Sequence, residues 1–232
     1  MKSLVVGMWE VGKWLFWVLS KRYTCVSKEK TDIEIEDGVD FMHICFPYSE
    51  WFVNEVERLV DLYKPMYTVI HSTVPVWTTQ KCADFFSPIV GKHPHLEESV
   101  ATFTKWIAWD DVEILEQYLN HAGIATEIFS STDSLEFAKI MCTTRYGMDI
   151  CFMKMMEQIC NERGYDFEEV YTNRTNNYNT WYLNMDNPEY WRPVLKPMPW
   201  KIGWHCVVQN TAFERNLATD FVKNFNDSLA SN

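Results

Sequence analysis

Glycine and paired cysteines are scarce in this sequence. Eight glycines occur among 232 residues, well below the ~7% usual in proteins. The cysteines number seven, and no two of them have the C-x-x-C spacing. An odd number without such pairs argues against a disulfide scaffold and against a zinc ribbon. We therefore expect a protein of a reducing compartment, the cytoplasm.

Long apolar runs are also missing. The run from Trp14 to Leu19 is far shorter than the roughly 20 residues that a helix needs to cross a bilayer. A glycine turn interrupts the apolar segment before it, and no small-residue cleavage site follows, so a signal peptide is not expected either. The pattern predicts a buried helix near the N-terminus and no membrane partner.

Basic residues are outnumbered, with 21 lysines and arginines against 32 aspartates and glutamates and a formal net charge of -11. Proteins that bind nucleic acid need clustered basic side chains to displace the counterions of the phosphates. The charge balance therefore argues against a nucleic-acid partner. Hydrophobic residues make up 47% of the chain, enough for a substantial core.

Strand-like and helix-like segments alternate along the chain, which is typical of a parallel sheet with helices on both faces. We predict a Rossmann-like, doubly wound, mainly parallel α/β fold for residues 1–131. Strands are expected at 3–6, 23–26, 41–46, 68–71, 87–90, 107–108 and 125–129. Helices are expected at 10–20, 50–63, 76–84, 111–121 and 133–162.

The remaining residues, 132–232, are predicted to form a helical domain. Its long first helix ends at Arg163 and Gly164, a basic residue in the last turn followed by a glycine that can cap the helix. Residues 172–204 are rich in Asn, Tyr, Trp and Pro and have little periodicity. We expect this stretch to be an ordered, loop-rich segment against the sheet, followed by a helix at 211–224.

The segment Leu4 to Gly12 has the cadence of a dinucleotide-binding turn. In the G-x-G-x-x-G pattern the first glycine makes the turn, the second lets the backbone reach the pyrophosphate, and the third lets the helix pack on the strand. Gly7 and Gly12 stand at the first and third positions, whereas Trp9 stands at the second. We expect Gly7, Trp9, Glu10, Val11 and Gly12 to surround the cofactor.

The end of the second expected strand bears on the choice of cofactor. An Asp or Glu about 20 residues after the first glycine normally binds the adenosine ribose of NAD, but Ser27 and Lys28 stand there, with Glu29 next. A polar residue beside a basic one would suit the 2′-phosphate of NADP, although a solvated turn with a chance lysine explains the pair equally well. NAD is the predicted cofactor, and NADP stays open.

Other polar residues follow the ends of expected strands, where α/β proteins bind their ligands. Pro47 ends a buried strand, and Ser72 and Thr73 follow the next one. We expect all three to contact the cofactor.

Five ordered segments of the chain carry further motifs, at 44–47, 72–78, 93–99, 136–147 and 203–210. In this order they resemble the motifs of the UDP-glucose and UDP-N-acetylmannosamine 6-dehydrogenases, the nucleotide-sugar dehydrogenase family. That family carries an I-C-V-P strand end, an S-T-V-P-x-G-T turn, an N-P-E-F-L-x-E-G segment, an E-x-x-K-x-x-x-N-x-x-x-A helix and a G-G-x-C loop. The resemblance covers the family's N-terminal and central parts.

The resemblance implies an NAD-dependent oxidation of an alcohol in two steps. Cys206 would be the nucleophile that captures the aldehyde as a thiohemiacetal before the second hydride transfer, which needs an accessible thiolate. Lys139 would stabilise the developing oxyanion, and Thr73 and Glu98 would help to place water and protons.

Two positions depart from the family pattern. Thr143 replaces the asparagine of the helix, and Asn210 replaces the aspartate that follows the cysteine. An amide cannot act as a general base, so the second oxidation is in doubt even with Cys206 correctly placed.

Each predicted site residue has a structural alternative. Cysteine is among the residue types most often buried, so Cys206 could be a core residue, and Lys139 could be a solvated helix charge. A zinc site made by Cys206 with His93, His95 or His205 is conceivable, but the spacing matches no known ligand pattern. No metal is therefore predicted.

Tryptophan recurs where the resembled family has glycine. Trp9 occupies the second glycine of the cofactor turn, Trp77 the glycine of S-T-V-P-x-G-T, and Trp204 the glycine before the x-C of the cysteine loop. We hypothesise that these positions are UGA codons read as glycine in a source with a reassigned code; UGG codons there would contradict it. Genuine tryptophans would block the pyrophosphate and leave a remnant fold.

Three classes of function follow. The first is an NAD(P)-dependent dehydrogenase for a small-molecule alcohol such as a sugar nucleotide. The second is a catalytically inactive Rossmann-like binding or assembly protein, and the third, least favoured, is a metal-dependent protein. The long helix at 133–162 corresponds to the dimerisation helix of the resembled family, so a homodimer is expected.

Overall fold

The computed structural model describes residues 1–35, 38–89, 96, 104–108, 112–203 and 207–229. Its chain divides into two compact units, Met1–Ile140 and Met141–Asn232. The long helix α5, Thr132–Arg163, begins in the first unit and continues in the second.

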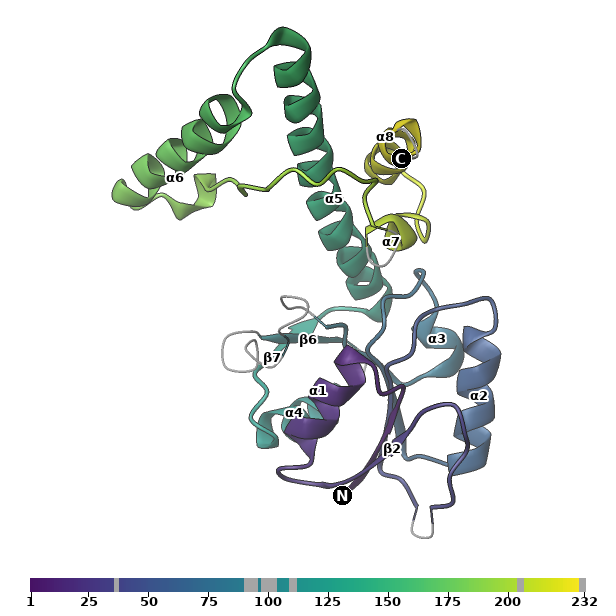
Figure 1. Cartoon of the computed structure of the whole chain (residues 1–232). Helices are drawn as coiled ribbons and strands as arrows, with labels where there is room; N and C mark the ends of the chain where they lie inside the picture. Colours follow the sequence, from purple (N-terminus) through teal and green to yellow (C-terminus); the bar gives the residue numbers. More distant parts are fainter. Residues whose placement is uncertain (36–37, 90–95, 97–103, 109–111, 204–206, 230–232) are drawn as a thin grey trace. The chain divides into compact units, whose positions relative to one another are not determined.

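The first unit is built on a seven-stranded sheet within the described residues, in the order β2-β1-β3-β4-β5-β6-β7 (Figure 1). All neighbouring strands run parallel except β5 and β6, which are antiparallel. The predicted mainly parallel α/β sheet is therefore confirmed. The strands are β1 Lys2–Val6, β2 Thr24–Lys28, β3 Phe41–Ile44, β4 Tyr67–Ile70, β5 Phe85–Phe86, β6 Lys105–Ala108 and β7 Thr126–Phe129.

Helices cover both faces of this sheet. The helices α1 and α4 lie on one face, and α2 and α3 lie on the other (Figure 1). Their bounds are α1 Glu10–Leu19, α2 Phe52–Tyr63, α3 Thr79–Cys82 and α4 Glu113–His121. This is the doubly wound arrangement that the alternating sequence predicts.

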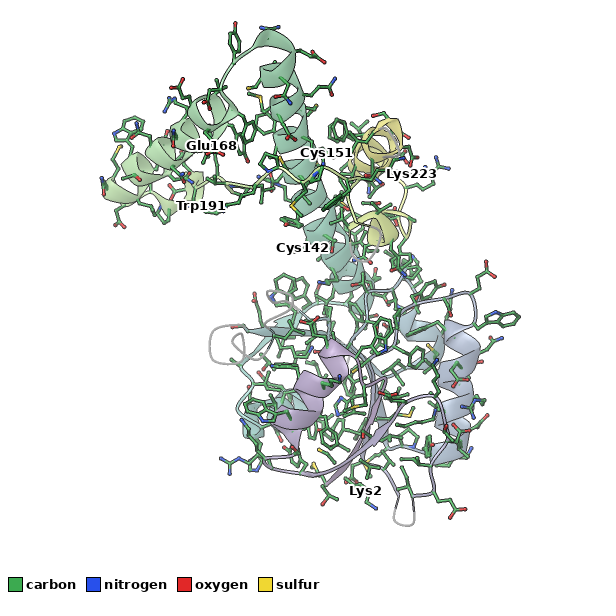
Figure 2. The ribbon with its side chains drawn as sticks, viewed as in Figure 1. Lys2, Cys142, Cys151, Glu168, Trp191 and Lys223 are labelled. Atoms are coloured by element: carbon green, nitrogen blue, oxygen red, sulfur yellow. The ribbon has the colours of Figure 1, made fainter. Side chains whose placement is uncertain are left out.

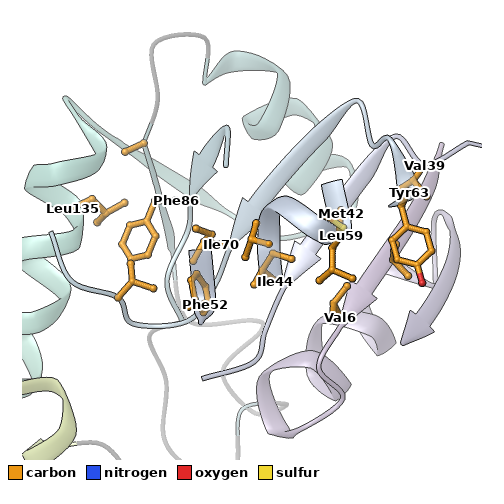
Figure 3. Packing of buried hydrophobic residues seen from close by; sticks show 14 residues of the cluster. Val6, Val39, Met42, Ile44, Phe52, Leu59, Tyr63, Ile70, Phe86 and Leu135 are labelled. Carbon is orange, nitrogen blue, oxygen red and sulfur yellow. The ribbon is translucent and has the colours of Figure 1, made fainter. Parts of the chain in front are cut away.

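The core consists of two apolar layers because successive strand residues point to opposite faces of a sheet. Leu4 and Val6 of β1 pack in the layer beneath α2, together with Phe52 and Leu59 of that helix (Figure 3). Val5, between them in sequence, packs in the other layer with side chains of α1 and α4. Residues buried on both faces explain why the strands read as continuous apolar runs.

The second unit is helical. After α5 come a π-helical turn η2 Glu168–Asn173, α6 Arg174–Asn184, a 3₁₀ turn η3 Pro188–Tyr190, α7 Gln209–Thr211 and α8 Leu217–Ser228. Cys142 and Cys151 mark α5 in Figure 2, and a small core joins Cys151 to Val207 and Val222. No helix in the described part of the chain is long and apolar enough to cross a membrane.

Several boundaries shift by a few residues, the helix expected at 76–84 being only Thr79–Cys82, and three segments differ in a way that has a physical reason. The stretch 172–204, expected to be loop-rich, contains α6, which is stabilised by ring contacts of Tyr182 with Tyr178 at 4.6 Å and Tyr190 at 4.7 Å. The strand expected at 87–90 lies at Phe85–Phe86, because both phenylalanines are buried. The last helix begins at Leu217 rather than residue 211, where Asn216 makes a capping box.

A chain of buried hydrogen bonds crosses the first unit. His71 Nδ1 lies 2.7 Å from the carbonyl oxygen of Ser87, which can only accept, so Nδ1 carries the proton. His71 Nε2 then accepts from Nδ1 of His43, 2.9 Å away. His43 Nε2 in turn accepts from Tyr118 OH at 3.0 Å, and Tyr118 accepts from Ser3 Oγ at 2.7 Å. The carbonyl fixes both histidine tautomers.

A lysine amine is buried beside this chain. The Nζ atom of Lys105 donates to the carbonyl oxygens of Ser87 and of Pro88, the latter at 3.1 Å. Burial disfavours the charged amine and lowers the pKa of Lys105 to about 7. Burial likewise lowers the pKa of His43 to about 3, so both its neighbours and its environment keep it neutral.

We predict that stability rises with pH above 7 because of Lys105. Its folded-state pKa of about 7 lies below the ordinary value of 10.5, so the unfolded chain binds a proton that the folded chain does not. The free energy of unfolding should rise by up to about 1.4 kcal/mol per pH unit. Urea unfolding between pH 7 and about 8, below the ordinary thiol pKa of about 8.5, measures this slope.

The Lys105→Met variant should show a flatter profile over this interval. Lys30→Met, at an exposed lysine, is the matched control and should keep the slope of the unchanged chain. A Lys105→Met profile as steep as that of the control would contradict the prediction.

Candidate functional site

The strand order creates a topological switch point beside β1. Strand β2 pairs with one edge of β1, and β3 pairs with the other edge of β1, so the direction in which the chain adds strands reverses at β1. Open α/β sheets bind ligands outside the carboxyl ends of the strands at such a point. Here those ends carry Gly7 after β1 and Cys45 after β3, and the Cys45 N–H donates to Val6 O at 2.8 Å.

The turn after β1 requires glycine at two positions. Gly7 has a φ of +92°, and a Cβ there would lie 2.8 Å from the backbone nitrogen of Phe46. A Cβ on Gly12 would lie 1.9 Å from the carbonyl oxygen of Gly7. The first glycine therefore makes the turn and the third admits the helix, as the dinucleotide-binding pattern requires.

Trp9 is the N-cap residue of α1, directly before its first residue Glu10, and 64% of its surface is exposed. Its φ of −77° is one that any residue adopts. Glycine is needed here only for a ligand, because the backbone of this position must approach the pyrophosphate. Glu10 and Val11 follow in the first turn of α1, where helix N–H groups favour an anion.

The end of β2 differs from the solvated turn that the sequence allowed. Lys28 is buried, and its Nζ atom forms an ion pair with Asp32 at 3.1 Å. Asp32 also binds the guanidinium of Arg58 at 2.8 Å, and these partners lower the pKa of Asp32 to about 2, with the Arg58 hydrogen bond as the largest cause. Ser27 lies half-buried beside them. The charge of Lys28 is therefore already balanced within the protein.

The next strand ends place the other expected cofactor residues. Ser72, just after β4, donates its hydroxyl to the carbonyl oxygen of Phe46 at 2.6 Å. That bond ties the end of β4 to the segment after β3, where Pro47 is exposed. Thr73 is half-buried next to Ser72. Pro47, Ser72 and Thr73 thus belong to neighbouring strand ends, as predicted from the sequence order.

A buried glutamate that the sequence reasoning gave no role holds the loop after β4. The carboxylate of Glu136, on α5, accepts the Trp77 N–H at 2.6 Å, the Thr79 N–H at 2.8 Å and the Thr79 hydroxyl at 2.6 Å. Burial raises the pKa of Glu136, and these hydrogen bonds oppose that shift. In the sequence, Glu136 could have been noticed as the first residue of the E-x-x-K segment.

Lys139 lies one turn further along α5 and binds the next strand end. Its Nζ atom donates to the carbonyl oxygen of Ile89 at 2.8 Å, and the side chain is half-buried. Its alternative interpretation as a fully solvated helix charge is therefore wrong. Glu136 and Lys139 together attach two strand-end loops to the beginning of one helix.

The two positions that depart from the resembled family contact each other in the second unit. The Nδ2 atom of Asn210 donates to Thr143 Oγ1 at 3.4 Å, and Asn210 is buried. An uncharged amide suits a hydroxyl partner, whereas a carboxylate at the buried position 210 would be costly to desolvate. This pairing gives a structural reason for the replacement of the aspartate.

Two predicted catalytic residues, Cys206 and Glu98, lie outside the described residues, as do the histidines considered as zinc ligands. Their roles stay predictions. Within the described ranges, no group of three or more His, Cys, Asp or Glu side chains is placed to hold a metal ion.

The strand order, the switch point and the glycine turn together define a Rossmann-type α/β domain followed by a helical unit. The sequence matches no protein-family model, and no curated protein is similar to it in sequence. Similarity to known proteins is therefore found only in the fold.

Solved structures of dehydrogenases share this fold. The chain is similar to a UDP-D-ManNAc dehydrogenase from Pyrococcus horikoshii, with 14% identity and a TM-score of 0.75 over 98% of this chain and 68% of that one. A UDP-glucose dehydrogenase from Pyrobaculum islandicum gives 11% identity and a TM-score of 0.69, with 97% and 68% covered. The chain thus spans about two thirds of the length of these nucleotide-sugar dehydrogenases.

A shorter type of dehydrogenase is similar over almost its whole length. The 3-hydroxyisobutyrate dehydrogenase of Mycobacterium tuberculosis shares 10% identity with a TM-score of 0.67, and 97% of this chain covers 92% of that one. The expected resemblance to nucleotide-sugar dehydrogenases is thus confirmed at the level of the fold, which extends to hydroxyacid dehydrogenases as well.

We predict that Glu136→Ala lowers the free energy of unfolding by about 2–4 kcal/mol, because it leaves two backbone N–H groups and a buried hydroxyl without their acceptor. Urea unfolding measures the change. Glu162→Ala, at an exposed carboxylate on the same helix, is the control and should stay within about 0.5 kcal/mol of the unchanged chain. Equal effects of the two substitutions would refute a clamping role for Glu136.

Proposed function

We propose that this protein is an NAD-dependent dehydrogenase that oxidises an alcohol group of a small molecule, in the manner of the nucleotide-sugar dehydrogenases. The observation that carries the proposal is the turn after β1, where Gly7 and Gly12 leave no room for a Cβ at the switch point of the sheet. Such a turn at this place is the recurring site of a dinucleotide pyrophosphate.

The residues after β1, β3 and β4 would hold the dinucleotide. The first turn of α1, from Glu10, would face the pyrophosphate, since backbone N–H groups at a helix N-terminus attract an anion. Pro47, Ser72 and Thr73 would line the nicotinamide side, at neighbouring strand ends. A bound nicotinamide supplies a hydride acceptor. The residue that fits least is Trp9, whose exposed indole replaces the second glycine.

NAD is proposed rather than NADP. A 2′-phosphate is recognised by a basic side chain near the end of β2, and Lys28 is the basic residue there. Its amine is buried and paired with Asp32 at 3.1 Å, so its charge is already compensated. NAD has a ribose hydroxyl in place of the 2′-phosphate, so its binding requires no unpaired basic side chain at this position.

Lys139 is the residue we propose for stabilising negative charge on the substrate oxygen. A fixed cation lowers the barrier for a step in which an alkoxide develops. Its hydrogen bond to Ile89 O, 2.8 Å long, orients the amine. Thr73 is proposed to place water or a proton. The capture of an aldehyde by Cys206 and the assistance of Glu98 remain predictions from the resemblance.

A sugar nucleotide is the proposed substrate class, and a 3-hydroxyacid is the closest competitor because that group of dehydrogenases has the same fold over nearly equal length. A second candidate function is favoured by one observation, the indole of Trp9 at the phosphate position. With tryptophan there, the chain would be a catalytically inactive binding or assembly protein on the same scaffold.

We propose a homodimer formed through α5. Several large apolar side chains of this helix are exposed in the single chain, and large exposed apolar surfaces on a helix typically mark an interface. They are Phe137, Tyr146, Met148, Phe152 and Ile159.

A cytoplasmic location is also proposed. It is supported by the cysteines of the described residues, which are all free of disulfide bonds, as expected in a reducing compartment.

Titration calorimetry tests the cofactor proposal. We predict that Trp9→Gly binds NAD at least tenfold more tightly than the unchanged chain, because removing the indole opens the approach to the pyrophosphate, and that NADP binds more weakly than NAD. Trp17→Ala removes an exposed indole elsewhere on α1 and is the matched control, with no gain in affinity. No binding of either dinucleotide by Trp9→Gly would eliminate the dehydrogenase.

Turnover of the Trp9→Gly protein is then followed by NADH absorbance with UDP-glucose, UDP-N-acetylmannosamine and 3-hydroxyisobutyrate. Lys139→Met in the same background should abolish turnover and retain NAD binding. Turnover unchanged by this substitution would contradict the role of Lys139.

Light scattering at micromolar concentration tests the dimer. The unchanged chain should have twice the mass of one chain, and the double variant Phe152→Lys, Ile159→Lys, at two exposed positions seven residues apart on one face of α5, should be monomeric because it buries two charges in the interface. Gln158→Lys, at an exposed polar position of α5, should remain dimeric. A monomeric unchanged chain would count against the proposal.

A further inference from the structure

The tryptophans of this protein are exposed to an unusual degree. Tryptophan is a large apolar residue that is highly buried on average. Nine tryptophans lie in the described residues, and seven of them have more than half of their surface exposed. These are Trp9, Trp17, Trp51, Trp77, Trp181, Trp191 and Trp200. Most tryptophans of the described residues therefore leave the greater part of their surface in contact with solvent.

Trp77 also has the backbone of a glycine. Its φ is +71°, in the left-handed region where a bulky side chain is a true outlier. The conformation is imposed from outside, because the Trp77 N–H and the Thr79 N–H are both bound by the carboxylate of Glu136 at 2.6 and 2.8 Å. The residue is 54% exposed, so less than half of its surface packs against the protein to offset the strain.

Trp9 points to glycine for a different reason. Its backbone is unstrained, but it lies between two positions that admit only glycine, since a Cβ on Gly7 or Gly12 would collide with backbone atoms. A turn that has glycine at these positions lets a phosphate group approach the main chain closely. A side chain at position 9, exposed at the start of the helix, obstructs that approach.

Trp106 shows what a genuine tryptophan looks like in the same domain. Its side chain is half-buried on β6 and packs against the core beneath α2. The indole Nε1 atom donates to Glu127 at 3.1 Å, and the ring lies 5.5 Å from that of Phe129. The apolar ring packs against other side chains and the indole N–H has a hydrogen-bond acceptor, as expected where tryptophan contributes to the structure.

We infer that positions 9 and 77 carry glycine in the protein as its source makes it, from UGA codons decoded as glycine, whereas position 106 carries tryptophan from a UGG codon. The glycine form has a complete pyrophosphate-binding turn at the end of β1 and an unstrained loop after β4. For position 9 the inference rests on the proposed dinucleotide site; for position 77 it rests on the backbone alone.

The coding DNA provides the first test. The expected result is UGA at codons 9 and 77 and UGG at codon 106. Peptide masses of the native protein should then show glycine at 9 and 77 and tryptophan at 106. UGG at 9 and 77, or tryptophan in those peptides, overturns the inference.

Thermal unfolding of recombinant protein provides the second test. Trp77→Gly should raise the melting temperature by about 2–4 °C, the shift expected in a chain of this size when the backbone strain of a single residue is relieved. Trp77→Ala removes the same indole but keeps the Cβ, so it should not produce this rise. Trp106→Gly should lower the melting temperature. An equal effect of glycine and alanine at position 77 overturns the strain argument.

Failure of the inference and failure of the proposed function give different results. UGA codons and a stabilising Trp77→Gly, with no binding of NAD to Trp9→Gly, would leave the glycine assignment standing and remove the dehydrogenase. UGG codons at both positions would remove the glycine assignment even if Trp9→Gly bound NAD.

Discussion

Helix α1 and the turn after β1 approach each other closely at Gly12, where a Cβ would lie 1.9 Å from the carbonyl oxygen of Gly7. Because position 12 has no side chain, α1 can begin directly above the carboxyl end of β1. The register of the sheet depends on the same point: the Gly7 N–H donates to Lys28 O, and the Cys45 N–H donates to Val6 O. One missing side chain thus brings three strand ends and a helix N-terminus to one place.

The beginning of α5 performs the corresponding task for the strands on the other side. Glu136 accepts hydrogen bonds from the loop after β4, and Lys139 donates to the segment after β5. A charged side chain held by backbone groups of a loop gives that loop a defined position, since loops otherwise have few fixed contacts. The expected catalytic cation and the buried carboxylate therefore share one supporting helix turn in the first unit.

The sheet and its glycine turn could be predicted from the sequence because both depend on local patterns: continuous apolar strands, alternating helices, and glycines at fixed offsets. Contacts between distant residues could not. The burial of Lys28 depends on Asp32 and Arg58, the role of Glu136 depends on a loop 57 residues away, and the pairing of Thr143 with Asn210 joins two positions that separately look like losses. The helix α6 was missed because it has little apolar periodicity and is stabilised by contacts between tyrosine rings, Tyr182 with Tyr178 and Tyr190.

The buried chain from Ser3 through Tyr118, His43 and His71 to Ser87 O has a consequence for evolution. Every donor in it points toward the carbonyl, and each side chain is at once acceptor and donor. Removing one member leaves its neighbours buried without a partner, which is more costly than replacing the whole chain by apolar residues. Among homologues these four side chains, on β1, α4, β3 and just after β4, are therefore expected to be inherited or lost as a set.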